Sequence, residues 1–183
     1  MKEQLRKNGG MPYRKKDFPN WPIYDERELE QLTEVLESGN WWRITGSKVL
    51  EFEQKFAEFQ GTKYCLGVTN GTSALELALS VFGIGEGDEV IVPAMTFIST
   101  GLAVINCDAT PVLVDIDPDT FCIIPEKIEE KVTERTKAII PVHMSGHGCD
   151  MDKICSIAKK YGLKVIEDAA HGHGGEWNGK RLG

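Results

Sequence analysis

Between Tyr64 and Asp168 the chain alternates short apolar runs with stretches of helical periodicity, and this alternation constrains the fold more than any other feature. The runs are YCLGV (64–68), EVIVP (89–93), PVLVD (111–115), KAIIPV (137–142) and LKVIED (163–168), with helical patterns between them at about 72–82, 99–107, 125–133 and 150–161. Strands that are apolar on both faces and separated by helices are typical of α/β proteins. We therefore predict an α/β fold with a mostly parallel sheet covered by helices on both faces. Right-handed crossovers bring the strand-to-helix loops together at the carboxyl ends of the strands, where we expect the functional site.

The segment before this alternation predicts an arm and two helices. Residues 1–22 are polar and contain Gly9-Gly10 and several prolines, so we expect a flexible N-terminal arm. Asp25 and Glu28 have the spacing of a capping box, and Ser38-Gly39 ends the helix that they begin. A second helix is expected between Ser47 and Gly61. The apolar face of the first helix is made of Leu29, Leu32, Val35 and Leu36.

Charge and composition exclude several classes of protein. The 183 residues contain 21 Lys and Arg against 28 Asp and Glu, a net charge of −7, so we expect no nucleic-acid partner. No run approaches the roughly 18 apolar residues that a membrane helix needs, and the basic N-terminus has no apolar signal region. The five cysteines form no CxxC pair, which favours a reduced, cytoplasmic chain.

The first candidate site is the turn TNGTSAL (69–75), which follows a predicted strand and begins a helix at Thr72 or Ser73. The free amides and the positive end of a helix dipole bind anions, and the two hydroxyl groups add donors. The alternative is that Thr72 and Ser73 only cap the helix. Gly71 is not followed by the Gly-Lys-Ser/Thr ending of a P-loop, and the nearby GIGEG (83–87) follows a helix, so we interpret it as a turn.

Two further candidates follow other strands. Glu167 and Asp168 end an apolar run and precede Ala-Ala, which leaves room for a flat ligand, and an acid placed there can hold a protonated ring nitrogen. The alternative for Asp168 is a helix N-cap. Phe97 also follows a strand, in PAMTF (93–97), and offers a flat face for stacking, although a loop phenylalanine often simply packs against its neighbours.

Two possible metal sites are weaker. The acids of DIDPD (115–119) with Glu126 fall on calcium-loop positions, but Thr120 stands where that loop needs glycine and no helix precedes it. The run HMSGHGCD (143–150) lacks a second ligand pair at zinc spacing. We expect no bound metal, and we expect His143 to be a residue at the site edge or a satisfied polar group.

Together, the three candidates place an anion cradle, a stacking ring and an acid for a ring nitrogen on loops of one sheet edge. That combination suits a phosphorylated aromatic cation such as pyridoxal 5'-phosphate (PLP). The motifs NGTSALELAL, GDEVIVPAMTFIST, PVLVDIDPDTF, TKAIIPVHMSG and VIEDAAHGHG together resemble the DegT/DnrJ/EryC1/StrS family. The resemblance implies a fold-type I PLP enzyme, usually an aminotransferase that moves an amino group from Glu or Gln to a keto-sugar or keto-cyclitol, and a homodimer.

The resemblance also implies roles for single residues. Gly71, Thr72 and Ser73 would hold the phosphate, Phe97 would stack on the pyridine ring, and Asp168 would pair with the ring nitrogen. His171 stands where most members carry Gln facing the 3-oxygen of the ring, a departure shared with the branch that contains 3-amino-5-hydroxybenzoate synthases. Trp41, Trp42 and Arg43 would border the substrate.

One family feature is missing from residues 1–183. The resemblance places the Schiff-base lysine about fifteen residues beyond Gly183, and Lys180 matches a non-catalytic position. We therefore expect residues 23–183 to be the N-terminal part of a PLP-transferase large domain, without the small C-terminal domain and inactive alone. Two alternatives stay open beside the aminotransferase: a dehydratase like 3-amino-5-hydroxybenzoate synthase, and a non-catalytic domain with a vestigial site.

Overall fold

The computed structural model describes residues 16–183, so most of the predicted arm, residues 1–15, lies outside the described residues. The chain divides into two compact units after Lys48. The first unit contains helix α1 (Glu26–Ser38), which begins and ends where the sequence predicts. Asp25 and Glu28 form the expected capping box, and Gly39 ends the helix with a φ of 68°, a conformation that glycine adopts without strain.

The apolar face of α1 is exposed within its own unit. Leu29, Leu32 and Leu36 each keep 64–68% of their surface accessible. The following loop closes on itself, because the amides of Thr45 and Gly46 both donate to the carbonyl of Trp42. A Cβ atom at position 46 would lie 2.7 Å from the carbonyl oxygen of Asn40, so only glycine fits this close approach.

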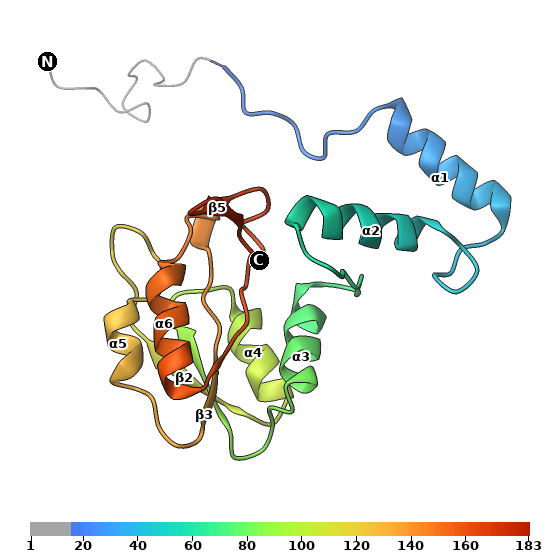
Figure 1. The fold of residues 1–183 in the computed structure, drawn as a ribbon. Helices are drawn as coiled ribbons and strands as arrows, with labels where there is room; N and C mark the ends of the chain where they lie inside the picture. Colours follow the sequence, from blue (N-terminus) through green and yellow to red (C-terminus); the bar gives the residue numbers. More distant parts are fainter. Residues whose placement is uncertain (1–15) are drawn as a thin grey trace, which may run out of the picture. The chain divides into compact units, whose positions relative to one another are not determined.

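The second unit carries the α/β fold (Figure 1). Its elements follow in the order α2 (Lys48–Gln60), α3 (Gly71–Val81), β1 (Glu89–Pro93), α4 (Ile98–Asn106), β2 (Thr110–Val114), α5 (Pro125–Glu129), β3 (Thr136–Ile139), the 3-10 turn Met144–Gly146, α6 (Met151–Tyr161), β4 (Lys164–Val165), β5 (Glu176–Trp177) and β6 (Lys180–Arg181). The first four strands form one parallel sheet in the order β2-β1-β3-β4. The predicted parallel α/β sheet is confirmed.

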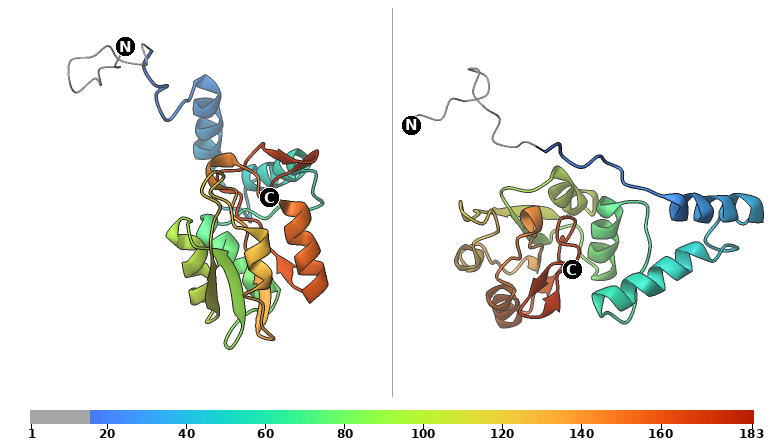
Figure 2. Two further views of the ribbon diagram at one scale, coloured as in Figure 1. Left: turned by 90° about the vertical axis from the view of Figure 1, so that its left-hand side faces the viewer. Right: turned by 90° about the horizontal axis from the view of Figure 1, so that it is seen from above.

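Both faces of this sheet are covered, as predicted. Successive residues of a strand point to opposite faces, and β1 shows the result: Val90 and Val92 pack into one apolar cluster and Ile91 into another. The first cluster contains Leu75 and Leu79 of α3 and Val104 of α4, and the second contains residues of α5 and α6. Figure 2 shows the two helix pairs on opposite sides of the strands.

The predicted strand at 64–68 is wrong for this structure. Tyr64 and Leu66 are 78% and 58% exposed, and the amide of Gly67 donates to the Glu53 carboxylate at 2.8 Å instead of to a neighbouring strand. An apolar run becomes a strand only where another strand takes up its backbone hydrogen bonds. The helix predicted at 125–133 is also shorter, since α5 ends at Glu129.

The C-terminal segment packs against α2. Asn178 and Gly179 form the predicted hairpin turn, both at positive φ, and join β5 to β6. The guanidinium of Arg181 lies 4.6 Å from the ring centre of Phe59. The side-chain amide of Gln60 donates to the Leu182 carbonyl at 2.9 Å.

Candidate active site at the carboxyl edge of the sheet

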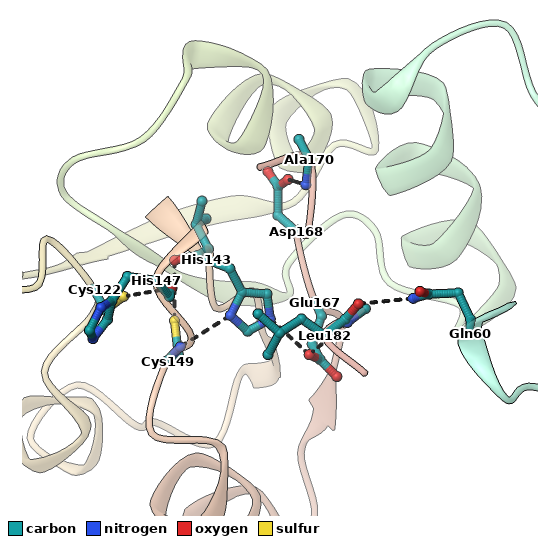
Figure 3. A network of polar contacts seen from close by, with 11 residues as sticks. Gln60, Cys122, His143, His147, Cys149, Glu167, Asp168, Ala170 and Leu182 are labelled. Carbon is teal, nitrogen blue, oxygen red and sulfur yellow. Dashed lines mark hydrogen bonds and ion pairs between the residues drawn. The ribbon is translucent and has the colours of Figure 1, made fainter. Parts of the chain in front are cut away.

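Asp168 lies at the carboxyl edge of the sheet, three residues beyond the end of β4. Its amide donates to the carbonyl of Pro141 and its carbonyl accepts from the amide of His143, so the backbone is held beside the continuation of β3. The carboxylate accepts a hydrogen bond from the Thr100 hydroxyl at 2.8 Å and one from the Ala170 amide at 3.3 Å. Figure 3 shows the carboxylate turned away from the buried His143. Asp168 therefore closes a turn, and the alternative of a helix N-cap is excluded because residues 169–175 form no helix.

Phe97 belongs to the same corner of the structure. It is the N-cap residue of α4, and the amide of Thr100, in the first turn of that helix, donates to its carbonyl at 3.1 Å. Phe97 is 72% exposed, so among the described residues it does not simply pack against its neighbours. The structure thus brings two predicted site residues, Phe97 and Asp168, onto a single shared neighbour, Thr100.

Glu167 does not share this site. The carboxylate oxygen Oε2 of Glu167 lies 2.8 Å from Nε2 of His143, which is fully buried, and also accepts from the amide of Gly183 at 3.1 Å (Figure 3). The Cys149 amide donates to Nδ1 of His143, so the proton of the neutral ring is on Nε2 and points at Glu167. Burial raises the pKa of Glu167, but these hydrogen bonds outweigh it and the net effect lowers the pKa. The sequence analysis allowed two roles for His143, a residue at the site edge or a satisfied polar group. The structure shows a satisfied polar group.

The predicted phosphate cradle is the N-terminus of α3, with a different cap from the one expected. Asn70 is the N-cap, accepting from the Ser73 amide at 2.9 Å, and the helix begins at Gly71. The cap therefore uses the Ser73 amide, whereas the amides of Gly71 and Thr72 are the first two of the helix and point out of it. The hydroxyl of Thr69 donates to that of Ser73 at 3.3 Å. A Cβ atom at position 71 would meet no heavy atom within 4 Å, which leaves open space beside the helix end.

Comparison with known proteins identifies the family of this chain. Residues 22–183 match the model of the DegT/DnrJ/EryC1/StrS aminotransferase family. The chain belongs to this family. It is 55% identical over 159 residues to dTDP-3-amino-3,6-dideoxy-alpha-D-galactopyranose transaminase of Aneurinibacillus thermoaerophilus, covering 86% of this chain and 43% of the relative. It is 50% identical over 167 residues to 3-amino-5-hydroxybenzoate synthase of Amycolatopsis mediterranei (strain S699), covering 91% of this chain and 43% of that enzyme.

Solved structures agree with the family assignment. A crystal structure of 3-amino-5-hydroxybenzoic acid synthase superposes with a TM-score of 0.90 at 50% identity, over 91% of this chain and 44% of that one. The PLP form of the putative sugar aminotransferase Spr1654 from Streptococcus pneumoniae gives a TM-score of 0.81 at 35% identity, over 87% of this chain and 44% of that one. The chain spans less than half the length of these relatives.

The family resemblance also selected His171, Trp42 and Arg43. Nδ1 of His171 accepts from the amide of Ser145 at 3.2 Å, and Ser145 is held at a φ of 53° in the turn before Gly146. Trp42 and Arg43 lie in the first unit, with the indole of Trp42 72% exposed.

The acidic residues of the possible calcium loop have partners within the chain. Asp117 accepts from the amides of Asp119 and Thr120, and Asp115 pairs with Lys127 at 2.7 Å. Within residues 16–183, the His, Cys, Asp and Glu side chains form no group of three that could hold a metal ion. The GIGEG segment is a turn, as interpreted, with Gly83 and Gly87 at positive φ.

Sequence reasoning missed three residues of this site: Thr96, Thr100 and Asn70. The hydroxyl groups of Thr96 and Thr100 are 2.8 Å apart. The sequence pattern carried no signal for this pair, because Thr96 lies before the helix that contains Thr100. Asn70 could have been recognised as a cap from its place three residues before Ser73.

The described residues suit the cofactor of the family. Phe97 offers an uncovered aromatic face, Asp168 offers a carboxylate held by two donors, and the end of α3 offers outward amides beside open space. A pyridinium ring with a phosphate arm needs these three kinds of contact. The donor set therefore fits PLP.

Proposed function

We propose that this chain is part of a PLP-dependent aminotransferase that transfers an amino group from Glu or Gln to a keto-sugar or keto-cyclitol. The observation that carries the proposal is the Asp168 carboxylate, held by the buried Thr100 in the same helical turn that presents Phe97. Family membership and the transaminase relative support the reaction class.

Each site residue has a specific task in this proposal. The amides of Gly71 and Thr72 with the Ser73 hydroxyl bind the phosphate, Phe97 covers one face of the ring, and Asp168 keeps the ring nitrogen protonated. When bound, PLP supplies the electron sink that stabilises negative charge at the amino carbon of the substrate. His171 orients the 3-oxygen of the ring, with its own ring fixed by the Ser145 amide.

The proposal extends beyond residues 1–183. The two relatives are more than twice as long as the part of them that matches this chain. We therefore place the catalytic lysine and the small domain in a segment that follows Gly183. Trp42 and Arg43 are assigned to the substrate side, and the assembly is a homodimer. The five free cysteines fit a reducing cytoplasm as its location. None of the helices in residues 16–183 is long and apolar enough to cross a membrane.

A second candidate function is a dehydratase of the 3-amino-5-hydroxybenzoate synthase type. Two features favour it: 50% identity to such an enzyme, and a histidine, His171, where the family resemblance places the residue facing the 3-oxygen. An assay of the protein from the complete coding sequence separates the two. Amino transfer to nucleotide-linked keto-sugars supports the first function, and aromatisation of an amino-cyclohexenone carboxylate without amino transfer supports the second.

Replacing Asp168 tests the cofactor site. In the protein from the complete coding sequence, Asp168→Ala should lower the rate of amino transfer by at least a hundredfold, since a charged partner of the reacting system contributes several kcal/mol. Asp119→Ala removes an exposed acid and should leave the rate unchanged. If the Asp168→Ala variant transfers amino groups at a rate within about tenfold of the parent rate, the assigned role is wrong.

A further inference from the structure

Thr100 stands between the two residues that the proposed function places against the PLP ring. It lies in the first turn of α4 and is fully buried. Its amide donates to the carbonyl of Phe97 at 3.1 Å, and its hydroxyl donates to Oδ2 of Asp168 at 2.8 Å. One residue thus contacts both the segment that presents the stacking ring and the acid 68 positions away in sequence.

The direction of the hydrogen bonds around Thr100 follows from the chemistry of the groups. An ionised carboxylate only accepts, so the single hydroxyl proton of Thr100 points to Asp168. The hydroxyl of Thr96, 2.8 Å away, must then donate to the Thr100 oxygen. The result is a chain from Thr96 through Thr100 to Asp168 in which every proton points toward the carboxylate, and successive bonds of this kind strengthen one another.

We propose that Thr100 is a positioning residue that holds the Asp168 carboxylate aimed at the cofactor ring, with Thr96 supporting it. The proposal rests on the proposed function, because it assigns Thr100 a role toward the ring that Asp168 contacts. Thr100 does not itself touch the ring in this assignment. Its effect reaches the cofactor through the carboxylate orientation and through the backbone of Phe97.

The test compares two substitutions of Thr100 in the protein from the complete coding sequence. Thr100→Val keeps the shape and removes the hydroxyl, whereas Thr100→Ser keeps the hydroxyl. Equilibrium dialysis should give about tenfold weaker PLP binding for Thr100→Val, the size of effect typical when a charged group loses one hydrogen-bond donor, and binding within about threefold of the parent for Thr100→Ser. Thr96→Val should have a smaller effect in the same direction.

A spectroscopic measurement separates positioning from a general loss of stability. The ¹⁵N resonance of PLP labelled at the ring nitrogen should move toward the unprotonated range in Thr100→Val and stay at the parent position in Thr100→Ser. Thr136→Val is the matched control, since it removes another buried threonine hydroxyl, near Glu89 at the opposite end of the sheet. That variant should lose stability without moving the ¹⁵N resonance or the PLP affinity.

The outcomes distinguish this inference from the proposed function. If the parent protein binds no PLP, or Asp168→Asn leaves PLP affinity and the ¹⁵N resonance unchanged, the proposed cofactor site is wrong. If Asp168→Asn moves both but Thr100→Val moves neither, the cofactor site stands and the role of Thr100 is refuted. If Thr100→Ser is as defective as Thr100→Val, packing rather than the hydroxyl is responsible and the proposal is also refuted.

Discussion

Glu167 and Asp168, just beyond β4, have opposite environments because an extended chain points successive side chains to opposite sides. Asp168 faces Thr100 of α4, whereas Glu167 meets the buried His143 and the amide of Gly183. Two carboxylates that look equivalent in sequence therefore separate into one acid that we propose binds a ligand, Asp168, and one acid that stabilises the fold, Glu167. The second role predicts a pH dependence.

Glu167→Gln tests the structural role of Glu167. The pKa of Glu167 is lowered in the folded chain, so its ionisation contributes stability that is fully present above the ordinary pKa of about 4.5 and is lost as the pH falls through the lowered value. Urea unfolding should therefore show a free-energy difference between parent and variant that is constant near pH 7 and shrinks below pH 4.5. The exposed Glu86→Gln should show no such trend. A difference that grows on acidification would give the opposite sign and contradict the assignment.

At the scale of elements, the N-terminus of α3 serves both the fold and the proposed phosphate site. Asn70 satisfies the Ser73 amide, which leaves the two earlier amides for an anion. The helix itself is held by Leu75 and Leu79, which are buried against the sheet. The cap is therefore a modest part of the stability of the second unit.

Asn70→Ala should destabilise the protein by about 1 kcal/mol, the usual cost of losing a side-chain cap. Asn70→Asp keeps an acceptor at the same place and should retain most of the stability, although its charge would compete with a bound phosphate. Chemical denaturation gives the stabilities, and phosphate titration gives the anion affinity. An unchanged unfolding midpoint for Asn70→Ala would show that the cap is not formed in solution.

At the scale of the whole molecule, the helices that cover the sheet expose apolar side chains on their outer faces. On α3 and α4 these are Leu77, Val81, Ile98, Leu102 and Ile105, each 38–74% exposed. Monomeric proteins seldom leave so many large apolar side chains in one region. This surface supports the proposed association of subunits.

Sedimentation should therefore show species larger than the monomer at micromolar concentration. The double change Val81→Glu and Ile105→Glu introduces charge on the outer face and should shift the distribution toward monomer. Lys159→Glu on α6 changes a charge on the other side of the sheet and serves as the control. A parent protein that sediments as a monomer across the concentration range would contradict the proposal.

The order of elements was readable from the sequence because local patterns specify it. Short apolar runs, capping residues such as Asp25 and turn residues such as Asn178-Gly179 act within a few positions, and the structure has α1, β1 and the hairpin where they predict. The same patterns identified Phe97 and Asp168, since strand ends meet at one edge of a parallel sheet.

Tertiary structure alone decided the contacts between distant segments. No local pattern shows that Thr100 lies against Asp168, or that His143 is aligned between Cys149 and Glu167. The run at 64–68 has the composition of a strand but pairs with none, because a strand requires a partner that its own residues do not specify. The sequence therefore predicts which residues lie at the carboxyl edge of the sheet, and only the tertiary packing decides which of these residues are in contact.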